Sequence, residues 1–110
     1  MRSDMQNLDE LKKRQQAITD ELADPAVYSD FQKSANVVRE LQKIKKHIDL
    51  LTDLDALEKR RLDNGNLIKT ESDIDLLSIA QKDLEEVEAK IKEQKKKLTE
   101  LERGASESID

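Results

Sequence analysis

Three kinds of side chain in this sequence could do chemistry: one histidine, many carboxylates and three basic clusters. His47 lies between Lys45-Lys46 and Asp49, and a metal or general-base role would need partner residues from elsewhere in the bundle. We therefore interpret His47 as a surface residue of a helix. The carboxylates, for example Glu85, Glu86 and Glu88, would have to converge in a dry pocket to act as acid and base. A solvated helix face is the simpler interpretation.

Nucleophilic and phosphate chemistry have no motif here. The sequence has no cysteine, no G-x-S-x-G, no GxGxxG and no P-loop, and its two glycines cannot build a phosphate cradle. We predict that the chain is not an enzyme and that it has no catalytic residue, metal site, cofactor or small-molecule ligand.

The basic clusters lie at residues 12–14, 59–61 and 95–97. The second cluster, Lys59, Arg60 and Arg61, could meet a phosphate backbone. The alternative is that each cluster is an exposed helix face balanced by nearby acids. No aromatic residues are interleaved for base stacking, which favours the balanced face.

Composition limits the fold to a thin helical one. Charged residues make up 41% of the chain and aromatics 2%, which excludes a thick globular core and leaves an elongated bundle or a disordered chain. The regular apolar spacing favours the bundle. The net charge of −5 gives no general attraction to nucleic acid or to an anionic membrane. No run approaches the ~18–20 apolar residues of a membrane span, and no apolar leader is present, so we expect no membrane partner and a cytoplasmic location.

Apolar periodicity predicts three helices, over residues 4–23, 29–63 and 72–103. Asp24-Pro25 should end the first, because proline breaks the hydrogen-bond ladder, and a turn should cover 25–28. Ser29 followed by Gln32 resembles a capping box that starts the second helix.

Asn64-Gly65-Asn66 should end the second helix, with a loop reaching Ser72. The third helix alternates apolar steps of three and four over four heptads, and Gly104 is its expected terminator. We therefore predict an all-α fold, an elongated antiparallel three-helix bundle or coiled coil with one short and two long helices. It should form a single domain over 1–103, followed by a flexible tail over 104–110.

The second and third helices should form a two-helix hairpin near Gly65, where the short first helix does not reach. The apolar residues there have no third helix to cover them: Leu57, Leu62, Leu67, Ile68, Ile74 and Leu76. Either the loop folds back over them or another surface covers them. We predict that a partner contacts this end of the hairpin, at Leu57, Leu62, Leu67, Ile68, Lys59, Arg60 and Arg61. Self-association through the same end of the hairpin is a further prediction.

Two motifs resemble the N-terminal helical domain of bacterial class I peptide chain release factors. Leu22-Ala23-Asp24-Pro25-Ala26-Val27-Tyr28-Ser29-Asp30 is similar to that family's "L-x-D-P-x-V-x-x-D" turn. The segment from Glu71 to Leu84, with Ala80, is similar to the opening of the family's third helix. The turn sequence leans toward the factor that reads UAA and UAG. The sequence has no Gly-Gly-Gln and no codon-reading tripeptide, so peptidyl-tRNA hydrolysis and codon recognition are not assigned to it.

The resemblance implies a non-catalytic module that faces the stalk base of the large ribosomal subunit and is coupled to the recycling GTPase. The alternative hypothesis is a stand-alone coiled-coil adaptor or scaffold that binds itself or a partner helix. A third hypothesis is an RNA contact through Lys59, Arg60 and Arg61.

Overall fold

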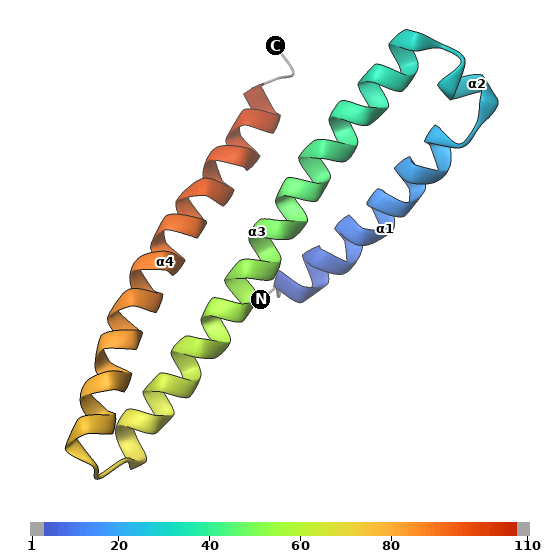
Figure 1. Ribbon diagram of the computed structural model, residues 1–110. Helices are drawn as coiled ribbons and strands as arrows, with labels where there is room; N and C mark the ends of the chain where they lie inside the picture. Colours follow the sequence, from blue (N-terminus) through green and yellow to red (C-terminus); the bar gives the residue numbers. More distant parts are fainter. Residues whose placement is uncertain (1–3, 108–110) are drawn as a thin grey trace. The chain divides into compact units, whose positions relative to one another are not determined.

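The computed structural model describes residues 4–107 and contains four helices in that range (Figure 1). They are α1 (Asp4–Leu22), α2 (Pro25–Tyr28), α3 (Phe31–Thr70) and α4 (Ile74–Glu107). No strand occurs among these residues, so the prediction of an all-α fold is confirmed. No helix within 4–107 combines the length and the apolar character that crossing a bilayer requires.

The chain divides into two compact units, called here unit 1, up to Leu51, and unit 2, from Thr52 onward. Unit 1 contains α1, α2 and the first part of α3, and Figure 1 shows α1 running antiparallel beside that part of α3. The Arg14 guanidinium on α1 forms an ion pair with Glu40 on α3, with Nε 3.0 Å from Oε1. Leu8, Ile18 and Leu51 are the buried apolar residues of unit 1 among those described.

The connection between α1 and α3 contains a helical turn and two aspartate caps. The Asp24 side chain accepts a hydrogen bond from the Ala26 N–H and starts α2 at Pro25, whose missing donor is harmless at that position. The predicted capping box at Ser29 is wrong. Asp30 caps α3 through the N–H groups of Gln32 and Lys33, because the Ser29 hydroxyl donates instead to the Pro25 carbonyl.

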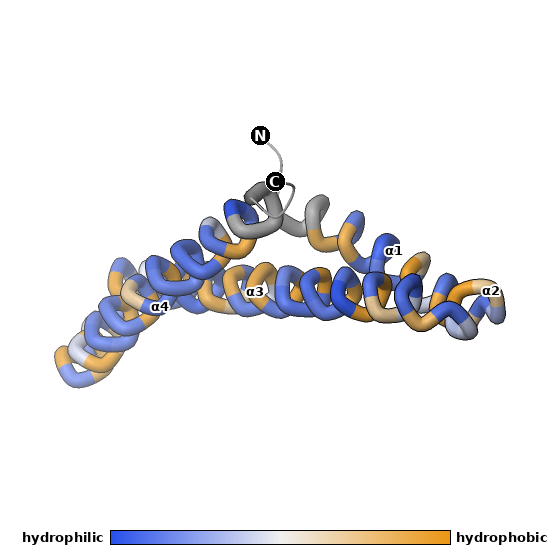
Figure 2. Tube along the Cα trace, turned by 90° about the horizontal axis from the view of Figure 1, so that it is seen from above, coloured by the Kyte–Doolittle hydropathy of each residue, from blue (hydrophilic) through white to orange (hydrophobic). Residues whose placement is uncertain are grey.

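Unit 2 is an antiparallel pair made by the rest of α3 and α4. Glu58 of α3 lies near Lys95 while Asn64, later in α3, lies near Asp83, so the two helices run in opposite directions. Their facing sides bury a cluster that Leu98 extends: Leu54, Leu57, Val87 and Ile91. In Figure 2 apolar and polar segments alternate along each helix, as expected for amphipathic helices.

The predicted loop over 64–72 is wrong, because α3 continues through Gly65 to Thr70 and leaves only residues 71–73 outside the helices. Gly65 keeps a negative φ, and the Asn64 amide donates to Asp83, so the asparagine fastens the helix to α4 instead of ending it. Glycine inside a helix costs about 1 kcal/mol, and the hydrogen bond between Asn64 and Asp83 helps to offset that cost. Asp73 then caps α4 by accepting from the N–H groups of Asp75 and Leu76.

The carboxyl end of the last helix also differs from the prediction. Gly104, the expected terminator, lies inside α4, which extends to Glu107, so residues 104–107 of the predicted tail are helical. Residues 108–110 lie outside the described range. A single domain over 1–103 stays a prediction.

Candidate functional site

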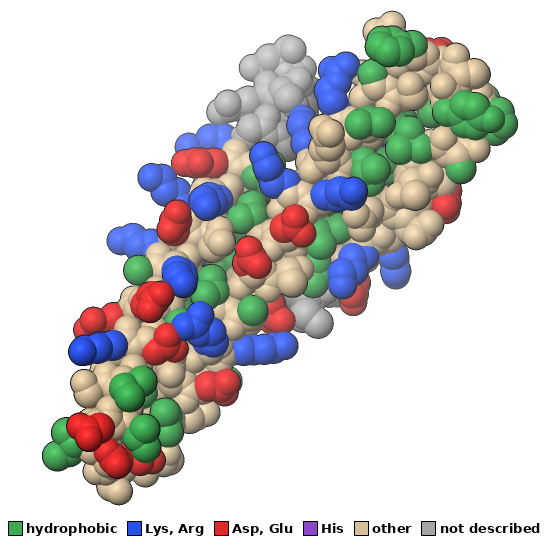
Figure 3. All heavy atoms as spheres, viewed as in Figure 1, with side chains coloured by type: hydrophobic (Ala, Val, Ile, Leu, Met, Phe, Trp, Pro, Cys, Tyr) green, Lys and Arg blue, Asp and Glu red, His purple; other side chains and the backbone are tan. Residues whose placement is uncertain are grey.

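The end of unit 2 where α3 meets α4 exposes large apolar side chains on both helices. We call this surface the tip and define it by its exposed members: Leu62, Leu67, Ile74, Leu76 and Ile79. Leu67 is 40% exposed and Ile79 64%. Figure 3 shows such apolar side chains gathered with acidic ones at this end. Exposed apolar residues on one small surface are typical of a partner-binding site.

Two of the predicted contact residues do not belong to this exposed surface. Leu57 is buried and packs in the cluster with Val87 and Ile91, so the expectation that it lacks cover is wrong. Ile68 is partly buried, and it lies on the side of α3 that Asn64 turns toward α4. Leu62 and Leu67 are exposed as expected.

The tip carries negative charge. Asp63, Glu71 and Asp75 lie next to its apolar residues, and none of the three forms an ion pair within the described part of the chain. Asp73 adds a fourth carboxylate, used as the α4 cap. Lys69 is the one basic residue from Leu62 to Ile79. The tip therefore favours an apolar partner surface with basic residues.

The three basic candidates are each held by a carboxylate of unit 2. Lys59 Nζ lies 3.2 Å from Asp55, one turn earlier on α3, and Arg61 lies 2.6 Å from Glu58. Arg60 reaches across to α4 and pairs with Asp83 at 2.5 Å. The structure thus balances the positive charge of these residues internally, as the simpler interpretation of a charged face expected.

Asp83 is the residue that sequence patterns did not single out. Its carboxylate accepts hydrogen bonds from the Asn64 amide at 2.6 Å and from the Arg60 guanidinium. These hydrogen bonds, the one from Asn64 first, hold the pKa of the Asp83 carboxyl below its ordinary value of 3.8. One feature of the sequence could have pointed to Asp83. Asn64 lies within a segment whose apolar periodicity continues on both sides, and such a position favours a hydrogen-bond partner on the neighbouring helix over a helix end.

Asp83→Asn is expected to destabilise unit 2 at neutral pH. The substitution removes the negative charge of the carboxylate that accepts hydrogen bonds from Asn64 and Arg60. Since the folded pKa is lowered, the stabilisation by the carboxylate is complete above 3.8 and is lost as the pH falls below that value. Urea unfolding at several pH values should therefore show that the free energies of unfolding of the original chain and the variant become equal in acid. Asp63→Asn, which removes an exposed carboxylate of α3, is the control. A difference that does not shrink below pH 3.8 would contradict the assignment.

His47 is partly buried on α3 in unit 1 and takes part in an interaction. Within the described residues no three His, Cys, Asp or Glu side chains gather as a metal site would require.

Comparison with known proteins gives one family match. The model of the family described as the PCRF domain matches residues 11–105, most of the chain. No match to the chain was found among curated proteins or among solved structures. The matched range contains both motifs at which the sequence resembles release factors, the Asp24-Pro25 turn and the Ala80 segment.

Proposed function

We propose, from the premise that this chain belongs to the PCRF domain family, that it is a release-factor module that docks on the large ribosomal subunit through its tip. Membership assigns it to translation termination and to a non-catalytic part of the release factor. The match over 11–105 is the observation that carries the proposal, and the exposed apolar tip supports the docking surface.

We assign the docking to the stalk base. Within the stalk base, we assign the contact to a protein surface and not to ribosomal RNA. An apolar, acidic surface gains little from phosphate, whereas it suits a protein face with apolar and basic side chains. The carboxylates Asp63, Glu71 and Asp75 would repel an RNA backbone. An RNA contact through Lys59, Arg60 and Arg61 would require those side chains to leave the carboxylates that hold them.

Pelleting of the chain with purified large subunits tests the docking. Leu67→Asp with Ile79→Asp is expected to weaken retention about tenfold or more, since buried charge at an apolar contact costs over 1.4 kcal/mol. Both residues are exposed, so the fold should persist. Val38→Asp, at a valine that is 39% exposed on α3 in unit 1, is the matched control and should bind as the original chain does. Equal retention of the tip variant, or no retention of any chain, would contradict the proposal.

Self-association through the tip is the second candidate function, because the same apolar residues could meet a second copy. Sedimentation velocity over a wide concentration range separates the two. A dimer that Leu67→Asp with Ile79→Asp disrupts would support the adaptor hypothesis. A monomer throughout would remove it.

The remaining parts of the proposal follow the release-factor family. We assign the module to the cytoplasm, to coupling with the recycling GTPase, and to a factor that reads UAA and UAG. The last assignment depends on the sequence of the Asp24-Pro25 turn. A termination assay with the protein that contains this chain tests it, and efficient release at UGA would overturn it.

A further inference from the structure

Asn64-Gly65 is a pair of residues whose own groups can react with each other. Asparagine followed by glycine loses its side-chain amide more readily than asparagine before other residues, because glycine has no side chain to hinder attack by its backbone nitrogen. Asn64 is the one asparagine of the sequence that precedes glycine. The others precede leucine or valine: Asn7, Asn36 and Asn66.

The reaction, deamidation, needs only the chain and water. The Gly65 nitrogen forms a bond to the side-chain carbonyl carbon of Asn64 and gives up its proton. The bond from that carbon to the amide nitrogen breaks, and the amide leaves with the proton as ammonia. Water then opens the cyclic succinimide at either of its carbonyl carbons. The product at position 64 is aspartate or isoaspartate, in which the main chain passes through the side-chain carbon.

The fold holds both reacting groups in other interactions. α3 is helical through Gly65, whose φ is negative and whose N–H therefore donates to the carbonyl one turn earlier. The Asn64 amide nitrogen donates to the Asp83 carboxylate of α4 at 2.6 Å, which directs the side chain toward α4. Attack requires that α3 open at this point and that the hydrogen bond to Asp83 break.

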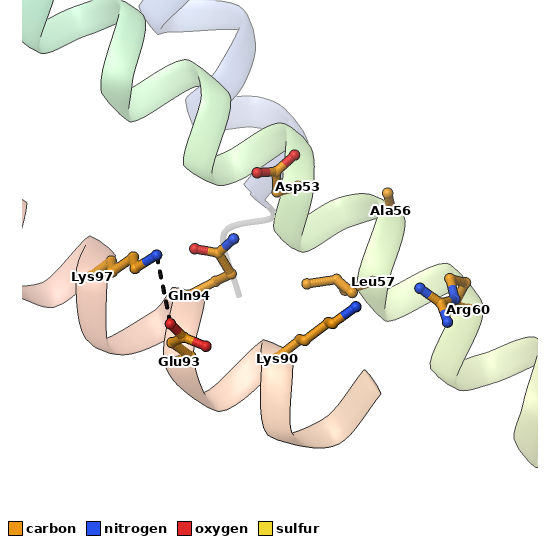
Figure 4. A pocket seen from close by; sticks show the side chains of 8 residues that line it. All are labelled: Asp53, Ala56, Leu57, Arg60, Lys90, Glu93, Gln94 and Lys97. Atoms are coloured by element: carbon orange, nitrogen blue, oxygen red, sulfur yellow. Dashed lines mark ion pairs between the residues drawn. The ribbon is translucent and has the colours of Figure 1, made fainter. Parts of the chain in front are cut away.

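The position of Asn64 makes such an opening local. Toward the middle of α3 the pairing with α4 is apolar, and Figure 4 shows Leu57 extending from α3 into the space between the two helices. At Arg60 and Asn64 the pairing is polar, since both side chains donate to Asp83. α3 ends at Thr70, and helix ends open at a smaller cost in free energy than packed middle segments.

We propose that Asn64 is a site of spontaneous deamidation that the hydrogen bond to Asp83 protects, and that the product keeps the end of α3 open. A carboxylate at position 64 has no hydrogen to donate to Asp83 and repels it, because like charges would lie within hydrogen-bond distance. Isoaspartate also adds a carbon atom to the main chain, which interrupts the hydrogen-bond ladder of the helix. The modified chain should therefore have the helix end at 64–66 that its residue types favour. The site and its protection are independent of any docking of the tip.

Peptide mapping by mass spectrometry tests the site and its protection. The chain is incubated at neutral pH in buffer and in guanidinium chloride that unfolds it. In the unfolded chain Asn64 should lose its amide, with isoaspartate among the products, and should react far faster than Asn36 and Asn66. In the folded chain the reaction should be slower by at least about tenfold, since it proceeds only while α3 is open. An intact Asn64 in guanidinium chloride, or equal rates in both states, would overturn the proposal.

Variants separate the protection from the reaction itself. Asp83→Ala removes the acceptor and should raise the rate in the folded chain about tenfold, as the loss of a hydrogen bond to a charged group allows. Asp83→Asn keeps an acceptor oxygen and should raise it less. Neither should change the rate in guanidinium chloride. Glu85→Ala, which removes an exposed carboxylate of the same helix, is the matched control. Gly65→Ala should slow the reaction in both states and remain folded, because a Cβ at Gly65 meets no atom within 4 Å. Asp83 variants that are folded by circular dichroism and react no faster would contradict the protection.

The effect of the product is measured with a substitution that mimics it. Asn64→Asp should lower the melting temperature by roughly 4–8 °C. Asn66→Asp places the same charge at an exposed position of α3 and should leave the melting temperature near that of the original chain. Hydrogen exchange of the backbone amides after residue 64 should become faster in Asn64→Asp alone. Equal melting temperatures for the two variants would overturn the proposal that the product keeps the end of α3 open.

Discussion

Leu54→Ala is expected to lower the free energy of unfolding of unit 2 by about 2–4 kcal/mol. Leu54 is 2% exposed and lies in the cluster with Leu57, Val87 and Ile91, so the truncation removes three carbons from a packed interior. A helical pair has no thick core that could rearrange to fill the space. Urea unfolding followed by circular dichroism at 222 nm measures the loss.

The control is the same change eight residues later on the same helix. Leu62 is 64% exposed, and alanine has the higher helix propensity, so Leu62→Ala should change stability by less than about 0.5 kcal/mol. The two variants share chemistry, helix and unit and differ in burial. Equal losses would show that the cluster around Val87 does not stabilise unit 2.

The helical pairing in unit 2 could be predicted because one physical rule determines it. Val87, Ile91, Gln94 and Leu98 follow steps of four, three and four, and such spacing leaves no other face of α4 to bury. The same stripe includes Gln94, which the rule places in the interface although it is polar. Its unpaired oxygen is a property of its surroundings, which periodicity does not describe.

Helix ends were predicted less well, because alternative side chains compete for the same backbone groups. Ser29 and Asp30 both suit an N-cap, and the hydroxyl of Ser29 is taken by the carbonyl of Pro25. Asn64-Gly65 has the residue types of a helix end, yet the bond from Asn64 to Asp83 keeps α3 helical. Both outcomes depend on a partner that local sequence does not identify.

The candidate site was predicted in part for the same reason. Exposure of Leu62 and Leu67 follows from their positions beside the buried stripe, and it was expected. Burial of Leu57, by contrast, depends on contact with Val87 and Ile91, thirty or more residues away in the chain. Ile79, which the sequence did not single out, belongs to the exposed tip because it flanks the buried Ala80.

Ile18→Ala is expected to destabilise unit 1 by about 2–4 kcal/mol and to leave unit 2 folded. Ile18 is fully buried in α1, with 0% exposure. The cluster of Leu54, Leu57, Val87 and Ile91 takes all its members from unit 2, so the truncation removes none of its contacts. Hydrogen exchange of backbone amides, read by residue, should show faster exchange in α1 and the first part of α3 and unchanged exchange in α4.

The continuity of α3 determines how far the loss can spread. When unit 1 opens, the first part of α3 loses its packing, and a helical segment of about 20 residues is marginal in water by itself. It should therefore fray toward Leu51 and stop where contacts with α4 begin. Ile79→Ala makes the same truncation at an isoleucine that is 64% exposed and should leave exchange unchanged. Faster exchange throughout α4 in Ile18→Ala would instead mean that the chain unfolds as one domain, as its sequence predicts.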